Sequence, residues 1–265
     1  MTTLPLPKSG RDAADVAAAA ARAAGEILKA HFRQETQVRY KGKGNIVTDV
    51  DLWAESSLIS LLQAEYPGHG ILSEESKPIS GDSGYAWVLD PLDGTNNYSF
   101  GVPFFCTVLA LTRGNDALLG IVYDPLRDEL FFARKGGGAS LNNRTISVSG
   151  KKTVQESLVG FDLGYVAENG KTMLSFVTGL WPNVYALRVM GSAALGMAYT
   201  ACGRLDLYFH LLLYPWELAC GQLLVTEAGG VATDWEGKPL TVGEGAVIAC
   251  NRAVHADFLR LVHVL

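Results

Sequence analysis

The sequence has little of what marks proteins that bind nucleic acids. Its 22 Lys and Arg residues are outnumbered by 27 Asp and Glu residues, which gives a formal net charge of −5. No run of basic residues is longer than a pair such as Lys151-Lys152. Proteins that bind phosphate backbones gather positive charge on one face, and nothing in this sequence provides it. We therefore expect no nucleic acid among its partners.

Cysteine and long apolar runs are also scarce. The four cysteines lie far apart, without a C-x-x-C pair: Cys106, Cys202, Cys220 and Cys250. This spacing predicts reduced thiols in the core rather than a zinc site. Charges such as Asp15 and Glu26 interrupt the long apolar stretches, and residues 1–8 lack the apolar segment of a signal peptide. We therefore expect a cytoplasmic protein that does not enter a membrane.

Residues 1–145 are predicted to form an N-terminal α+β half that begins with helices. The alanine-rich segment from Ser9 to Phe32 predicts a helix. Ser9 would open it, with Asp12 three residues later in a pattern that resembles a capping box. A second helix is expected from Asp51 to Tyr66, because a Pro-Gly pair follows directly.

Short strands follow these helices. Residues 41–45, Lys-Gly-Lys-Gly-Asn, indicate a flexible polar loop between the two helices. Beyond the second helix, three β-rich runs are separated by short turn sequences, at residues 104–112, 118–123 and 129–133. That pattern predicts an antiparallel meander.

Residues 146–265 are predicted to form a C-terminal α/β half. Four runs have the composition of strands, at residues 158–163, 185–189, 206–209 and 246–250. They alternate with four helical stretches, at residues 171–180, 192–202, 217–228 and 253–264. Alternation of this kind is typical of α/β architecture. At 265 residues the chain is long enough to bury a substantial core.

The most informative stretch is DPLDGTNNY, residues 90–98, which directly follows an apolar run. Two carboxylates three residues apart at the end of a buried strand repel each other and lose hydration. A positive charge between them is therefore expected. Pro91 stiffens the turn so that Asp90 and Asp93 can point to one side, and the carbonyl of Leu92 becomes available as a further oxygen ligand.

Other carboxylates occur where a solvated surface is not the simplest explanation. They lie at a helix start, after an apolar pair and at the start of an apolar helix: Asp49 and Asp51, Glu74 and Glu75, and Glu217. Mg²⁺ prefers oxygen ligands and commonly binds carboxylates together with substrate phosphate. Gly94 permits close backbone approach, and Thr95 opens a segment whose N–H groups can hold an anion. Together these residues predict a Mg²⁺ site that binds a phosphorylated ligand.

Most of these acids have ordinary explanations when each is considered alone. Asp51 could be a helix N-cap, Glu74 a solvated loop residue, and Glu217 a first-turn acid favoured by the helix dipole. An EF-hand loop that starts at Asp90 fails, because its third and fifth positions carry no acid or amide. The D-x-D-G-T motif of haloacid dehalogenases places its acids one residue closer together, and an aspartyl-phosphatase of that type stays a runner-up.

Seven stretches across nearly the whole chain form a recognisable set: NIVTDVD (45–51), ILSEES (71–76), WVLDPLDGTNNY (87–98), GIVYDP (120–125), RKGGGASLNN (134–143), GSAAL (191–195) and PWELACGQLLVTEAGG (215–230). This set resembles the inositol monophosphatase family, within the Mg²⁺-dependent, lithium-sensitive phosphatase superfamily that includes fructose-1,6-bisphosphatases. The resemblance implies a layered α/β/α/β/α sandwich with the site between its two halves. It also implies a homodimer.

The resemblance further implies two Mg²⁺ ions, or three, and a ligand set for them. Glu74, Asp90 and the carbonyl of Leu92 would hold the first ion. Asp90, Asp93 and Glu217 would hold the second, and Glu74 would also contact a third. The N-terminal half thus carries most of the metal ligands, while the C-terminal half carries Glu217 and the substrate-contacting positions.

Catalytic and substrate-binding positions also follow from the resemblance. Asp51 and Thr95 match the pair that orients and deprotonates the attacking water, and Glu74 is counted with them as catalytic. The N–H groups of Gly94 and Thr95 match the phosphate cradle. The other predicted substrate contacts are Asp93, Ala193 and His210. No phosphoenzyme is expected on this pathway.

Two positions depart from the family pattern. Glu217 stands where the family has aspartate after the tryptophan, and its extra methylene must move either the helix or the second ion. His210 stands where inositol-preferring members commonly carry a glutamate that accepts hydrogen bonds from sugar hydroxyls. Histidine has a different charge and donor pattern. His210 could contact the substrate or could simply cap a strand.

The sequence therefore predicts Mg²⁺-dependent hydrolysis of a small phosphorylated metabolite, with inositol monophosphate the leading substrate. Relatives in the resembled superfamily also act on fructose 1,6-bisphosphate, NADP, 3′-phosphoadenosine 5′-phosphate and histidinol phosphate. A hypothesis of another class is a phospho-ligand-binding regulator whose catalysis is impaired by Glu217.

Overall fold

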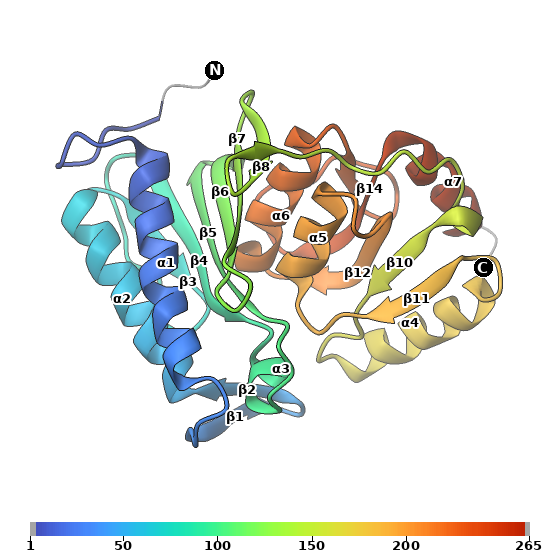
Figure 1. Cartoon of the computed structure of the whole chain (residues 1–265), viewed down its shortest axis with the longest axis horizontal. Coiled ribbons are helices and arrows are strands. Elements are labelled where there is room, and N and C mark those ends of the chain that lie inside the picture. The colour runs from blue at the N-terminus through green and yellow to red at the C-terminus, as the bar shows by residue number, and fades with distance from the viewer. Residues whose placement is uncertain (1–3, 263–265) are drawn as a thin grey trace.

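The computed structural model of the chain describes residues 4–262 (Figure 1). Residues 1–3 of the predicted untargeted N-terminus and the last residues of the helix expected at 253–264 lie outside this range. The described chain forms five layers in the order helices, sheet, helices, sheet, helices (Figure 1). This is the layered α/β/α/β/α arrangement predicted from the sequence.

The larger sheet has seven strands whose spatial order follows the chain. They are β3 (Gly70–Ser73), β4 (Tyr85–Asp93), β5 (Cys106–Arg113), β6 (Asp116–Asp124), β7 (Glu129–Arg134), β8 (Gly138–Leu141) and β9 (Arg144–Thr145). β3 and β4 are parallel, and each later pair is antiparallel. The predicted meander is confirmed in β5 to β7, where short turns join neighbouring strands.

Two helices, α1 (Ala13–His31) and α2 (Asp49–Glu65), cover the outer face of this sheet (Figure 1). The predicted start of the first helix at Ser9 is wrong. Gly10 has a φ of +72°, which breaks the helical backbone before Asp12. Asp12 is the N-cap instead, and its Oδ1 accepts a hydrogen bond from the N–H of Ala14 at 2.8 Å.

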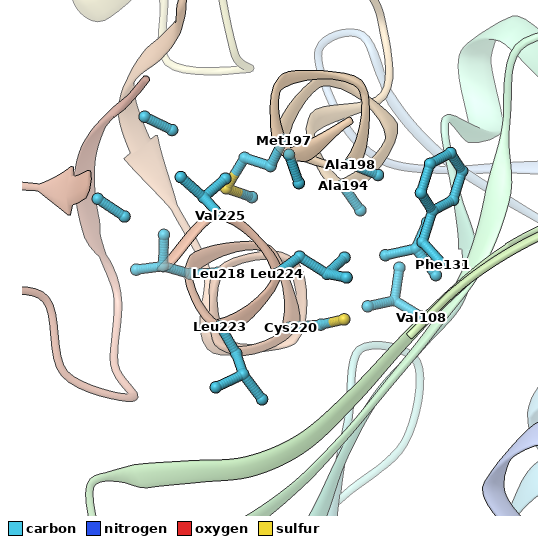
Figure 2. Packing of buried hydrophobic residues seen from close by; sticks show 14 of the residues in the cluster. Val108, Phe131, Ala194, Met197, Ala198, Leu218, Cys220, Leu223, Leu224 and Val225 are labelled. Atoms are coloured by element: carbon cyan, nitrogen blue, oxygen red, sulfur yellow. The ribbon is translucent and has the colours of Figure 1, made fainter. Parts of the chain in front are cut away.

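The middle layer consists of α5 (Ala193–Ala201) and α6 (Pro215–Glu227), packed between the two sheets (Figure 1). Figure 2 shows Val108 and Phe131 of the larger sheet facing the side of α6 that carries Cys220 and Leu224. A Cβ added at Gly120 would lie only 2.8 Å from Cys220 Sγ. Glycine therefore lets α6 approach β6 closely, which brings the start of α6 near the ends of the strands.

The smaller sheet has five strands in the order β11, β10, β12, β14, β13. Their ranges are Ala186–Val189, Leu158–Phe161, Leu207–Leu213, Gly245–Cys250 and Val231–Thr233. β10 is parallel to both β11 and β12, whereas β14 is antiparallel to β12 and β13. The outer helices are α4 (Ala167–Leu180) and α7 (Arg252–Val262), and a short 3₁₀ helix, η1, spans Val154–Glu156. The predicted alternation of strands and helices is confirmed.

The predicted flexible loop at residues 41–45 is wrong. Lys41 and Gly42 end β1 (Val38–Gly42), Asn45 begins β2 (Asn45–Thr48), and the two strands pair as an antiparallel hairpin. Tyr40 of β1 lies opposite Ile46 of β2, and both residue types favour strands. Gly44 turns the chain between the two strands with a φ of +72°. The turn is held near α3 (Thr95–Ser99), because Asn96 Nδ2 donates to the carbonyl of Gly44 at 2.8 Å.

Two further expectations concern cysteine and membranes. The four cysteines are free, three of them buried and Cys202 half-buried, as predicted for reduced thiols near the core. Among the helices formed by residues 4–262, none combines the length and apolar character needed to cross a bilayer.

Candidate active site

The DPLD motif forms the end of β4 and contains a β-bulge. Asp90 is opposite Val108 and Asp93 is opposite Cys106, so β4 has one residue more than β5 in this interval. Proline is tolerated at a bulge because it has no N–H to leave unpaired. The bulge at Pro91 therefore places both carboxylates at the end of the strand without breaking the sheet.

Asp51, Thr95 and Leu92 are joined by hydrogen bonds. Thr95 Oγ1 lies 3.0 Å from Asp51 Oδ1 and 2.9 Å from the carbonyl oxygen of Leu92. A hydroxyl has one proton, so it donates to only one of these acceptors at a time. The other oxygen of Asp51 accepts from the N–H of Thr48 at 2.8 Å and from its hydroxyl. Burial nevertheless raises the pKa of Asp51 to about 6.

Asp93 ties β4 to the start of α5. Its Oδ2 accepts hydrogen bonds from the hydroxyl of Ser192 and from the N–H of Ala194, the latter at 2.9 Å. Burial raises the pKa of Asp93 to about 6 in spite of these bonds. The predicted substrate position Ala193 is thereby held next to Asp93, although the two residues are far apart in the sequence.

The position of Gly94 has no room for a side chain. Its φ is +93°, and an added Cβ would lie 3.0 Å from the carbonyl oxygen of Phe104 and 3.2 Å from that of Gly191. Both the conformation and the close contacts exclude larger residues. The backbone of Gly94 therefore packs closely against the backbone at Phe104 and Gly191.

The acids predicted as metal ligands lie close enough to affect one another. Burial raises the pKa of Asp90 well above its usual range, and the charges of Glu74, Asp93 and Glu217 raise it further. The pKa of Glu217 is also raised, first by burial and then by the charge of Asp93. The structure thus brings acids from three separate sequence motifs into one buried, negatively charged cluster.

Lys41 of the hairpin supplies one positive charge to this cluster. Its Nζ lies 2.6 Å from Glu74 Oε1 and 2.7 Å from Glu75 Oε1. Burial lowers the pKa of Lys41, but the two carboxylates outweigh it and the net shift is upward. Burial raises the pKa of Glu75 to about 7. Lys41 therefore neutralises part of the charge on the hairpin side.

The donor set fits a hard divalent cation, because it consists of carboxylate and carbonyl oxygens that carry more negative charge than Lys41 offsets. Within residues 4–262, no three His, Cys, Asp or Glu side chains already surround a common point closely enough to hold an ion. Glu74 is bonded to Lys41, and Glu217 Oε2 accepts from the N–H of Tyr214 at 2.8 Å. Completing the ligand set therefore requires these side chains to rotate.

A cavity of about 220 Å³ opens beside the acids. Its lining includes five of the predicted site residues, Asp93, Gly94, Ala193, His210 and Glu217. Much of the remaining wall comes from Leu163, Tyr165, Val166, Val189, Leu212 and Tyr214. Asp51, Glu74, Asp90, Leu92 and Thr95 do not line this cavity. Four of the five predicted substrate positions therefore share one space beside the acid cluster, and Thr95 lies outside it.

His210 lies within β12 (Leu207–Leu213) and does not cap the strand, and it also lines the cavity. β12 has one extra residue between His210 and Leu213, opposite the interval from Val247 to Gly245, so this strand also bulges. The N–H of Leu212 in the bulge donates to Nδ1 of His210 at 3.0 Å. Burial lowers the pKa of His210 to about 4. The imidazole therefore satisfies the bulged strand and lines the cavity as a neutral ring.

Asp162 is a site residue that the sequence analysis missed. Its Oδ1 accepts from the N–H groups of Met190, at 2.9 Å, and Gly191. Its Oδ2 accepts from the hydroxyl of Tyr208 at 2.8 Å, and burial raises its pKa to about 7. Asp162 directly follows the apolar strand β10, just as Asp90 follows an apolar run, and that signal was available in the sequence.

Comparison with known proteins shows which proteins the chain is similar to. The sequence model described as "Inositol monophosphatase family" matches residues 11–264. Inositol-1-monophosphatase of Mesorhizobium japonicum is 35% identical over 247 residues, which cover 92% of this chain and 93% of that one. Nus factor SuhB of Escherichia coli is 36% identical over 244 residues, 91% of each chain. The solved IMPase of Thermotoga maritima has a TM-score of 0.87 at 30% identity, covering 96% of this chain and 98% of that one.

These similarities confirm the family resemblance, the layered sandwich and the enzyme class, phosphoric monoester hydrolase, that the sequence predicted. They extend over nearly the whole chain and not over a single motif. The chain belongs to the inositol monophosphatase family.

Proposed function

We propose that this protein hydrolyses a small phosphomonoester in a Mg²⁺-dependent reaction, with inositol monophosphate as the first substrate to test. The observation that carries the proposal is a buried cluster of acids, beside a cavity of about 220 Å³, in which burial and the neighbouring acids raise the pKa of Asp90. A bound cation would favour the ionised form of these acids. The similarity to a protein named inositol-1-monophosphatase supports the choice of substrate.

The residues that would hold the ions are Glu74, Asp90, Asp93, Glu217 and the carbonyl of Leu92. When bound, Mg²⁺ would acidify a water molecule and offset the charge that builds on the phosphoryl and leaving oxygens. The N-terminal half to residue 145 would supply most of these ligands, and the half from residue 146 would supply Glu217 and the substrate contacts. We take two ions as the basic set, with a third at Glu74.

Asp51 and Thr95 are proposed to move the proton of the attacking water. Thr95 Oγ1 already lies within hydrogen-bond distance of Asp51 Oδ1. Thr95 passes its hydroxyl proton to Asp51 and takes one from the water, so the hydroxyl is regenerated and Asp51 becomes neutral. Because burial raises the pKa of Asp51 to about 6, this carboxylate is a stronger base than an exposed aspartate and is still ionised at neutral pH.

The remaining residues are proposed to hold the substrate. The N–H groups of Gly94 and Thr95 would bind the phosphate, and the alcohol half would enter the cavity past Ala193 toward His210. Asp93 fixes the start of α5 through the N–H of Ala194, at 2.9 Å, so the alcohol contacts keep their place relative to the acids. Because a water molecule attacks the phosphate, the proposed reaction forms no phosphoenzyme.

Phosphate release from a panel of inositol, sugar and nucleotide phosphates, with Mg²⁺ varied, tests the proposal. We expect Mg²⁺-dependent release that falls at least about 100-fold in Asp90→Asn, because a ligand shared by the ions is lost. Asp15→Asn, the same change on the exposed face of α1, is the control and should be unaffected. Release that does not depend on Mg²⁺, or that survives in Asp90→Asn, would contradict the proposal.

Two alternatives have their own signatures. An aspartyl-phosphatase would form a phosphoenzyme that can be trapped, whereas the proposed reaction forms none and is inhibited by lithium. The similarity to the relative named Nus factor SuhB is the reason to test a second candidate, a phospho-ligand-binding regulator. That candidate requires Mg²⁺ binding without turnover of any phosphomonoester. The homodimer implied by the resemblance is tested separately, by the mass of the protein in solution.

A further inference from the structure

The imidazole of His210 is fixed in one orientation by the strand that carries it. The bulge between His210 and Leu213 removes Leu212 from the regular ladder with β14. The freed N–H of Leu212 donates to Nδ1 of His210 at 3.0 Å. The carbonyl of His210 accepts from Trp235 Nε1 at 3.0 Å, which holds the same residue from the other side. The first contact therefore holds the ring, and the second holds the backbone of the same residue.

These contacts decide which ring nitrogen carries the proton. Nδ1 accepts a hydrogen bond, so it has no hydrogen, and the neutral ring carries its proton on Nε2. Within residues 4–262, Nε2 of His210 has no hydrogen-bond acceptor. Gly164 also lines the cavity, and a Cβ added to it would lie 3.6 Å from Nε2 of His210. His210 thus presents an unused N–H donor at the alcohol side of the site.

The rest of the cavity wall is mixed, because Asn96, Asn169 and Tyr214 line it together with apolar side chains. More of the cavity surface is apolar than polar, with Leu163, Val166, Val189 and Leu212 among its lining residues. Asp162, which also lines the cavity, already accepts three hydrogen bonds from the protein. Hydroxyls that lie against the apolar part of this wall would be left unpaired, and each unpaired buried donor weakens binding.

We infer that His210 makes the alcohol side a donor subsite, which selects phosphomonoesters whose alcohol half has an apolar face and a hydrogen-bond acceptor, such as an ether oxygen, over polyol phosphates. This inference rests on the proposed phosphatase function and names the substrate class for the same site. An ether oxygen accepts from Nε2–H and has no proton of its own to place against the apolar part of the wall.

Two matched esters separate hydrogen bonding from hydrophobic burial. Tetrahydropyran-4-yl phosphate differs from cyclohexyl phosphate only in an ether oxygen that replaces one ring methylene. Water favours the ether, so burial alone would make cyclohexyl phosphate the better substrate. With the His210 donor in place, we expect kcat/KM to be about fivefold higher for the tetrahydropyranyl ester, the equivalent of one ordinary hydrogen bond.

Three variants test the role of the donor. His210→Leu should remove the preference or reverse it toward cyclohexyl phosphate, and His210→Gln, which keeps an N–H donor, should retain part of it. His210→Glu should raise the kcat/KM of myo-inositol 1-phosphate relative to the tetrahydropyranyl ester. Thermal unfolding of each variant checks that the bulge survives, because Leu212 loses its acceptor in His210→Leu.

The outcomes distinguish this inference from the function on which it rests. Equal kcat/KM for the two matched esters in the wild type, or an unchanged preference in folded His210→Leu, would overturn the donor subsite while leaving the phosphatase intact. No release of phosphate from any of the three esters would contradict the proposed phosphatase itself, and the substrate class with it.

Discussion

The two ends of the candidate site are built by the same backbone feature but with opposite chemistry. A bulge in β4 lies between Asp90 and Asp93, and a bulge in β12 lies between His210 and Leu213. In β4 the extra residue brings together carboxylates that burial and mutual repulsion make costly. In β12 it releases an N–H that donates to Nδ1 of His210, whose pKa burial lowers to about 4. The bulge of β4 thus gathers carboxyl groups, whereas the bulge of β12 holds a neutral side chain.

This difference indicates which part of the site sets the reaction and which sets the substrate. The acid end depends on charge, so its residues are restricted to carboxylates that can bind ions and move protons. The alcohol end depends on shape and on a few hydrogen bonds. Of the two departures from the pattern its family suggests, Glu217 lies at the acid end and His210 at the alcohol end. Variants at the two ends should therefore change different kinetic quantities.

The largest effect is expected at the acid end, from removal of the Thr95 hydroxyl. Thr95→Val keeps the shape of the side chain but cannot pass a proton to Asp51, so kcat should fall about 100-fold or more. Thr95→Ser keeps the hydroxyl and should stay within about tenfold of wild type. Steady-state kinetics check this, and equal activity of the two variants would show that the hydroxyl has no catalytic role.

The pH dependence of stability should reveal the charge of the acid end. Burial raises the pKa values of Asp51 and Asp93 from 3.8 to about 6 in the folded chain, so the folded state binds more protons than the unfolded state across that window. Without Mg²⁺, the free energy of unfolding should therefore fall by about 2 kcal/mol for each of the two carboxyl groups as pH rises from 4 to 7.

Mg²⁺ supplies the control for this experiment. Saturating Mg²⁺ should flatten or reverse the decline, because a bound cation favours ionised carboxylates. Denaturant unfolding at several pH values, with EDTA or with Mg²⁺, measures both slopes. Identical slopes under the two conditions would mean that these acids do not bind the ion.

Lys41 offers a smaller test on the hairpin side of the acids. Lys41→Met leaves Glu74 and Glu75 without their shared counter-charge, so the metal-free protein should lose about 1 kcal/mol of stability. Lys43 lies two residues along the same hairpin and makes no ion pair within residues 4–262. Lys43→Met should therefore change stability by less than about 0.5 kcal/mol. Denaturant unfolding compares the two, and equal losses would rule out an effect specific to the Lys41 ion pairs.

The smallest expected effect concerns Glu217. Glu217→Asp shortens the side chain that now accepts from the N–H of Tyr214, so the Mg²⁺ concentration that gives half-maximal rate should shift by about threefold to tenfold. Glu227→Asp, at the other end of α6, is the control and should leave it unchanged. An unchanged Mg²⁺ dependence in Glu217→Asp would show that Glu217 is not a ligand.

Patterns that depend on neighbouring residues were predictable from the sequence. The meander, the alternating second half and the buried strand before Asp90 all follow from periodicity and turn residues. The hairpin at residues 38–48 was not, because β1 is exposed along its whole length and the Lys-Gly repeat has the composition of a loop. Ser9 failed as a cap because the conformation of Gly10 is not visible in a composition pattern.

Contacts between distant residues were beyond sequence reasoning alone. The bond from Ala194 to Asp93, the Lys41 bridge between two glutamates and the tautomer of His210 each depend on how the layers pack. Asp162 could have been found, since it follows a strand as Asp90 does, but its role depends on Tyr208 and Gly191 from other elements. Local patterns thus located the acids, and only the fold showed how they are held.

Calorimetric titration of Mg²⁺ into the metal-free protein tests the central claim most directly, because that claim is that the buried acids form a cation site. Wild type and Asp15→Asn should bind with the same saturable curve, and Asp90→Asn should bind at least about tenfold more weakly. Binding by Asp90→Asn that matches the wild type would contradict the account.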